Sequence, residues 1–140
     1  MRIKLAAVVA GLVLLSGAAS LKAHHSFSAE FDATKPFKMT GTVTKVEWTN
    51  PHVWVYLNVK DKATGQVTNW GFEMGPPHGL QRRGWRRETL KIGESVTVQG
   101  SMAKNGTKRM NASSVTMTST GGRPGETLDA ASSGAANADQ

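Results

Sequence analysis

The sequence predicts an all-β domain with one short helix: a small five-stranded barrel of the OB type, with the element order β-β-β-α-β-β. Residues 52–60 alternate strictly between aliphatic and polar or aromatic side chains, which is the period of a strand with one buried face. Turn signals divide the flanking sequence into further short segments rich in Val and Thr, and one segment of helical character lies among them. A split sandwich made of the same hairpins is the main alternative.

The first residues have the order of a secretory leader. Two basic residues precede the uncharged apolar run Leu5–Leu15, and small residues follow it. The run is shorter than the about 20 residues that span a bilayer. Cleavage after Ala23 gives a signal peptide over residues 1–23 and leaves His24 first, whereas cleavage after Ala19 is the alternative. We expect a periplasmic or secreted protein with no transmembrane segment after the leader is removed.

The composition narrows the class of protein. The chain has no cysteine, so a small exported domain must be held together by packing alone. The sequence carries 17 Lys and Arg against 10 Asp and Glu, but Arg2, Lys4 and Lys22 lie in or beside the leader. The charge of the domain therefore gives little support to nucleic-acid binding, and export argues against it although the fold would suit it.

The first strand is expected over Met39–Trp48, after an extended lead-in at Phe31–Phe37. Its alternation is imperfect, because Val43 is out of phase with Val46, and this predicts a bulge or a strongly bent strand. The sequence Thr49–Pro51 then turns the chain, since Asn bonds locally and Pro cannot donate to a strand ladder.

The second strand, His52–Lys60, is the clearest element of the chain. Its aliphatic face holds Val53, Val55, Leu57 and Val59. Its other face carries His52, Trp54 and Tyr56 at one end. A glycine-containing loop at Asp61–Gly65 predicts a hairpin to a third strand at about Gln66–Met74, in which Trp70, Phe72 and Met74 share one face.

The second half of the chain supplies the helix and two more strands. Prolines precede His78–Leu90, which favours one short helix there. The fourth strand is expected over Ser95–Met102 with Val96, Val98 and Gly100 inward. Asn105–Gly106 is the strongest hairpin signal in the chain and leads to a fifth strand at about Arg109–Thr118.

The C-terminal segment differs in composition from the domain over residues 24–118. From Ser119 onward Gly, Ala, Ser, Asn and Asp dominate. Such a segment buries too little apolar surface to offset the entropy of ordering, so residues 119–140 are predicted to be a disordered tail.

Four motifs together resemble a known family. They are His24–Phe27 (HHSF), Gly41–Trp54 (GTVTKVEWTNPHVW), Trp70–Gly75 (WGFEMG) and Arg82–Trp85 (RRGW). The chain resembles an uncharacterised family of small exported bacterial proteins, catalogued as a domain of unknown function, over about His24–Met117. This resemblance implies export and a single small β domain, and it implies no activity, ligand or catalytic residue.

The histidines are the candidate metal ligands: His24, His25, His52 and His78. If His24 becomes the N-terminus, its amine and ring nitrogen can chelate one metal ion. A third nitrogen from another histidine would complete a site suited to copper(II). The alternative is a solvated histidine pair, with His52 bonded to its own turn.

Two further groups are candidate ligand-binding residues. Trp54 and Tyr56 could form a stacking platform for a flat ligand, unless the bent strands bury them. The arginines of the predicted helix are Arg82, Arg83, Arg86 and Arg87. At helical spacing they fall into two pairs of guanidinium forks able to grip phosphate or carboxylate, and the alternative is a solvated basic face.

The sequence lacks the signatures of the common enzyme classes. It has no cysteine nucleophile, no phosphate loop and no HExxH pattern. We therefore expect a non-enzymatic exported binding module, with copper bound through histidines as the leading ligand. The alternative is an adaptor that binds a partner protein or an anionic envelope component through the arginines and the aromatic face, without metal.

Overall fold

The computed structural model describes residues 27–118 and 125–131. Its elements are β1 (Phe31–Glu47), β2 (Trp54–Lys60), β3 (Val67–Glu73), α3 (Pro77–Arg82), β4 (Ser95–Ala103), β5 (Arg109–Met117) and β6 (Thr127–Asp129). The predicted hairpins between the second and third strands and between the fourth and fifth strands are both present. The helix lies between β3 and β4, as expected.

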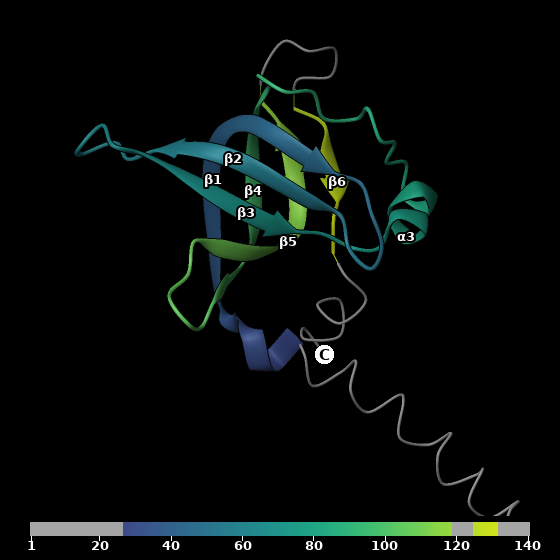
Figure 1. Cartoon of the computed structure of the whole chain (residues 1–140), viewed down its shortest axis with the longest axis horizontal. Helices are drawn as coiled ribbons and strands as arrows, with labels where there is room; N and C mark the ends of the chain where they lie inside the picture. The colour runs from purple at the N-terminus through teal and green to yellow at the C-terminus, as the bar shows by residue number, and fades with distance from the viewer. Residues whose placement is uncertain (1–26, 119–124, 132–140) are drawn as a thin grey trace, which may run out of the picture.

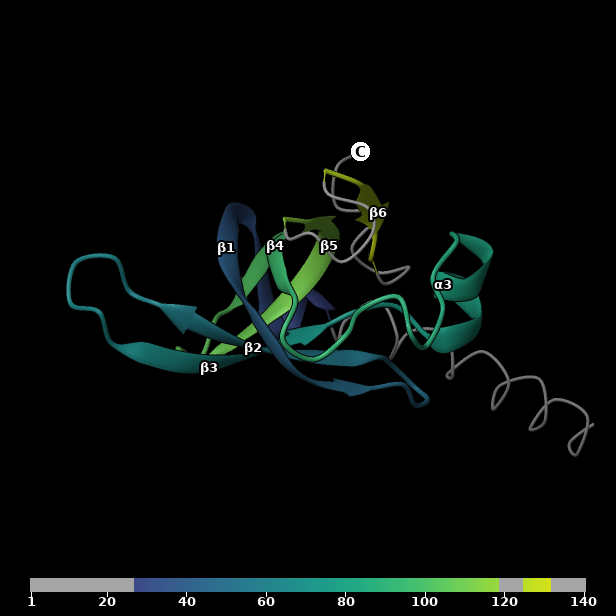
Figure 2. The same cartoon turned by 90° about the horizontal axis from the view of Figure 1, so that it is seen from above.

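Strands β1 to β5 close into a barrel (Figure 1). Neighbouring strands follow the order β3-β2-β1-β4-β5, and a parallel pairing of β3 with β5 closes the ring. The barrel predicted from the sequence is therefore confirmed. Figure 2 shows the β2–β3 hairpin projecting from one end of the barrel, with α3 at the opposite end.

Strand β1 is longer than predicted and serves two neighbours. Its first part, which includes the expected lead-in, pairs with β4, and its last part pairs with β2. The register with β2 shifts between Val43 and Lys45, which confirms the predicted irregularity. This bend carries the strand from one side of the barrel to the other.

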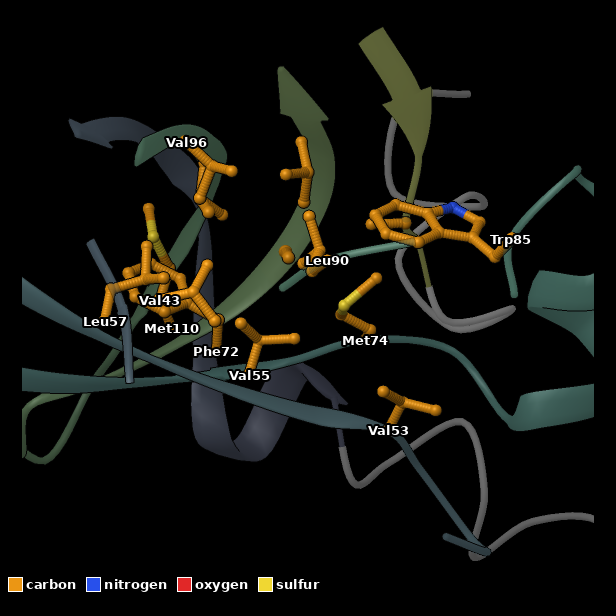
Figure 3. Close-up of a cluster of buried hydrophobic side chains, with 14 of the residues drawn as sticks. Val43, Val53, Val55, Leu57, Phe72, Met74, Trp85, Leu90, Val96 and Met110 are labelled. Atoms are coloured by element: carbon orange, nitrogen blue, oxygen red, sulfur yellow. The ribbon is translucent and has the colours of Figure 1, made fainter. Parts of the chain in front are cut away.

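The aliphatic face of β2 points into the barrel (Figure 3). Val55 and Leu57 are 2% and 0% exposed, and Phe72 and Met74 from β3 and the residue after it lie beside them. Four methionines fill the same core: Met39, Met74, Met110 and Met117. Trp48 and Trp70 are also buried there, as their phase predicted. The outward face of β2 is thus the one left for a ligand.

Helix α3 is much shorter than the predicted His78–Leu90. It ends at Arg82, and Gly84 takes a φ of +92°, a conformation that stops a helix and favours glycine. Trp85 then turns inward and is 1% exposed. In the part of the chain that the structure describes, no helix is long and apolar enough to cross a membrane.

Residues 125–131 are ordered, although they fall in the segment predicted to be disordered. Strand β6 pairs with β5, and Ala130 and Ala131 are buried. The amide of Gly75 donates to the carbonyl of Ala130 (2.9 Å), and Nε1 of Trp85 donates to the carbonyl of Asp129 (2.7 Å). Backbone pairing and two small side chains hold this segment, so its low content of large apolar residues was misleading.

Candidate functional site

Two aromatic rings lie side by side on the outward face of β2. The centroids of Trp54 and Tyr56 are 6.4 Å apart, their planes differ by 25°, and both side chains are half-buried. Gly71 lies opposite Tyr56 on β3. A Cβ at Gly71 would stand 3.3 Å from Cε1 of Tyr56 and 3.6 Å from Cε3 of Trp54, so this glycine lets the rings lie against the strand. We call the surface formed by Trp54, Tyr56 and Gly71 the ring face.

Two cations flank the ring face. The guanidinium of Arg109 lies 4.5 Å from the Trp54 ring centroid, and Nζ of Lys45 lies 5.5 Å from that of Tyr56. The barrel closure places Arg109 there, because the parallel β3–β5 pairing sets it opposite Gly71. Both contacts have the geometry of a cation held over an aromatic ring.

Glu47 organises the Lys45 side of the ring face. The hydroxyl of Tyr56 donates to its Oε2 (3.1 Å), and Nζ of Lys45 lies 2.5 Å from its Oε1. The bonds from Lys45 and then Tyr56 lower the pKa of Glu47. Burial, followed by the bond to Glu47, raises the pKa of Tyr56. The charge of Lys45 is therefore already paired.

His52 lies against Glu73 at the other end. Nδ1 of His52 lies 2.8 Å from Oε1 of Glu73, whose side chain is only 11% exposed. Burial raises the pKa of Glu73, the charge of His52 opposes that shift, and the nearby Glu30 adds to it. Glu73 and Trp54 are direct cross-strand partners, so this pair adjoins the rings.

A cleft of about 210 Å³ opens beside Arg109. It is lined by Glu30, Phe31, Ala103, Asn105, Thr107 and Arg109. One wall is the helical turn at residues 27–30, which Lys104 holds by donating from Nζ to the carbonyl of Ser28 (2.6 Å). The cleft thus combines charged, amide and hydroxyl groups next to the ring face.

The predicted metal ligands are not assembled among the described residues. His24 and His25 lie outside those residues, and His78 is exposed on α3. Within residues 27–118 and 125–131, no three histidine, aspartate or glutamate side chains are grouped so that they could hold a metal ion. His52 lies beside the ring face, against Glu73, although β2 begins at Trp54 and not at His52 as predicted.

The arginines are not arranged as two pairs of forks on a helix. Because α3 ends at Arg82, the helical spacing does not extend to the other three. Arg83 donates to the carbonyl of Ala131 and lies 3.5 Å from the carboxylate of Asp129. Arg86 donates to the carbonyls of Gln81 and Trp85. Arg83 and Arg86 therefore bind the chain's own carbonyl groups, although all four arginines are exposed.

Sequence reasoning missed Arg109 and the roles of the two glutamates. Arg109 lies three residues after the Asn105–Gly106 turn, but only the register of the closing strands brings it to Trp54. Glu47 and Glu73 both lie opposite Trp54 in its cross-strand row. Their positions within strands were visible in the sequence, but the pairing that gathers them around one tryptophan was not.

A comparison with sequence models of protein families found a match that covers most of the chain. The sequence model described as "Family of unknown function (DUF6152)" matches residues 10–112. A search of curated proteins found no match to the chain.

Proposed function

The chain belongs to the DUF6152 family, whose function is unknown, and we propose that it is an exported, non-enzymatic binding module that holds a cell-envelope component on the ring face. The observation that carries this proposal is the pair of rings on the outward side of β2. Aromatic side chains contribute large apolar surfaces and are usually buried, so two half-exposed rings held in parallel suit a ligand.

The fold supports the same surface. In OB-type barrels the outer face of the second and third strands, with the neighbouring loops, is where ligands bind. Here that face carries Trp54 and Tyr56, the first residue of β5 adds Arg109, and the loop before β5 lines the adjoining cleft. The leader supports export, which makes envelope material the accessible ligand.

Co-sedimentation with isolated cell-envelope material tests this proposal. The double variant Trp54→Ala/Tyr56→Ala should lose retention, while Ile92→Ala should keep it. Ile92 is a matched control because it is an apolar side chain that is 75% exposed and lies in the loop before β4. Equal retention of the double variant and wild type, both folded by circular dichroism, would refute the proposal.

Copper binding through His24, His25, His52 and His78 is a second proposal, favoured by one contact. A carboxylate bonded to one ring nitrogen of a histidine orients the other nitrogen for a metal, and Glu73 stands in that relation to His52. The test is to determine the mature N-terminus by intact mass and then titrate copper(II) against wild type, His24→Ala and His52→Ala. Affinity unchanged by both substitutions would refute it.

A further inference from the structure

Resting on the proposed function, we propose that the ring face and the cleft beside Arg109 bind an uncharged oligosaccharide. OB-type barrels bind two main classes of polymer at this face, oligonucleotides and oligosaccharides. Both classes stack on aromatic rings, so the rings alone do not distinguish them. The charges around the rings do.

The charged groups at this site are balanced rather than basic. Lys45 is paired with Glu47, and His52 with Glu73. Glu30 lines the cleft together with Arg109 and opposes its charge. A polyanion such as a nucleic acid requires a groove that presents unpaired cations to successive phosphates. Three carboxylates around two rings are the wrong environment for such a strand.

The same groups suit the hydroxyls of a sugar. A sugar hydroxyl both donates and accepts hydrogen bonds, and the cleft is lined by the carboxylate of Glu30 and the guanidinium of Arg109. The Thr107 hydroxyl donates to Oδ1 of Asn105, so the Asn105 NH₂ group is left as a donor and the Thr107 oxygen as an acceptor. The guanidinium of Arg109 is stacked on Trp54, and among the described residues it makes no side-chain hydrogen bond or ion pair. Its N–H groups are therefore oriented and available beside the rings.

The arrangement accounts for both parts of a sugar ring. The apolar C–H face of one sugar packs on the exposed parts of Trp54 and Tyr56 that Arg109 and Lys45 leave uncovered. The hydroxyls of the next sugar reach Arg109 and the cleft. Because the rings are pre-positioned over Gly71, stacking requires no rearrangement of β2 or β3. Arg109 is thus a specificity residue that connects the platform to the polar cleft.

The test is calorimetric titration of the mature protein with a fixed panel of hexasaccharides and one single-stranded oligonucleotide. The uncharged members are β-1,4-glucan, α-1,4-glucan and β-1,4-linked N-acetylglucosamine, and the charged members are a uronate hexasaccharide and oligothymidylate. We expect at least one uncharged hexasaccharide to bind. Its affinity should change less than about twofold between about 50 and 200 mM salt, a range over which phosphate-dependent binding weakens by orders of magnitude.

Variants assign the binding to this site. Trp54→Ala and Arg109→Gln should each weaken the uncharged hexasaccharide about tenfold or more, while Trp54→Phe should retain stacking and most of the affinity. Lys108→Gln is the matched control, because Lys108 is the neighbouring cation but lies over Trp70 instead. Equal losses in Lys108→Gln and Arg109→Gln would overturn the role of Arg109.

Other outcomes overturn the proposal while leaving the proposed function separately testable. Binding confined to the uronate or to oligothymidylate, with steep salt dependence, would show a polyanion site. If none of the three uncharged hexasaccharides binds while co-sedimentation still depends on Trp54 and Tyr56, the oligosaccharide proposal is refuted. The ring face would then bind another component of the envelope. Failure of both experiments would refute the ring face itself.

Discussion

The substitution Gly75→Ala decides whether residues 125–131 are docked on the barrel. A Cβ at Gly75 would lie 2.9 Å from the carbonyl oxygen of Ala131. Cβ atoms in proteins essentially never approach another heavy atom closer than 3.0 Å. Such overpacking costs about 1–3 kcal/mol. Gly75 has no positive φ, so replacing it also restricts the unfolded chain, which stabilises the protein by about 0.4–1 kcal/mol. The midpoints of the two ranges, about 2 and about 0.7 kcal/mol, give an expected net loss of about 1.3 kcal/mol in the free energy of unfolding.

The sign of the effect should reverse when the segment is absent. In a chain ending at Thr118 the nearest remaining atom to the new Cβ is Cδ2 of Leu80 at 3.6 Å, an ordinary contact. There the same substitution should stabilise the protein. Urea unfolding of the four proteins, with and without the substitution in each chain length, measures both values. A full-length Gly75→Ala variant as stable as its parent, or more stable, would refute the docking of Ala131.

Three further predictions follow from individual contacts. Tyr56 is the single tyrosine of the chain, so an ultraviolet titration of tyrosinate reports its pKa alone. That pKa should lie above the ordinary 10.0 in wild type and should fall toward 10.0 in Glu47→Gln. An unchanged midpoint in the variant would contradict the bond to Glu47. Burial raises the pKa of Glu73 in the folded protein above 4.5, so the folded state binds this proton more tightly than the unfolded chain does. The resulting contribution to the free energy of unfolding is fully present below pH 4.5 and is lost as the pH rises through the folded-state pKa. Glu73→Gln should therefore gain stability relative to wild type as the pH rises through this range in urea unfolding, and a difference independent of pH would be inconsistent with that burial. Gly100→Ala would place a Cβ 1.9 Å from the carbonyl oxygen of Asn111 and should lower the free energy of unfolding in urea by about 3 kcal/mol or more. Gly79→Ala on α3 is the control, because its Cβ would meet nothing closer than 3.4 Å. Similar stabilities of the two variants would count against the β4–β5 register.

The sequence predicted the elements that depend on local pattern. Strict alternation located β2 and separated its aliphatic face from its rings, and the Asp61–Gly65 and Asn105–Gly106 turns located both hairpins. The phase break at Val43 correctly indicated an irregular β1. These signals are local, because side-chain period and turn chemistry act over a few residues.

The features that the sequence did not predict depend on contacts between distant segments. The position of Arg109 over Trp54 requires the register of the β3–β5 closure. The shortened α3 reflects the burial of Trp85, which competes with the helical propensity of its arginine-rich neighbours. The docking of Ala130 depends on backbone groups at Gly75, and composition does not report such pairing. Tertiary contacts overrode local preference in each case.

The indole N–H signals of the four tryptophans test the ring face most directly. Trp48, Trp70 and Trp85 are buried in the core, whereas Trp54 is half-exposed on β2, and the variant Trp54→Phe assigns its signal in a proton–nitrogen correlation spectrum. When soluble envelope polysaccharide is added, we expect the Trp54 signal to shift while the three buried indoles stay in place. A ligand that binds and leaves Trp54 unmoved would contradict the assignment of this surface.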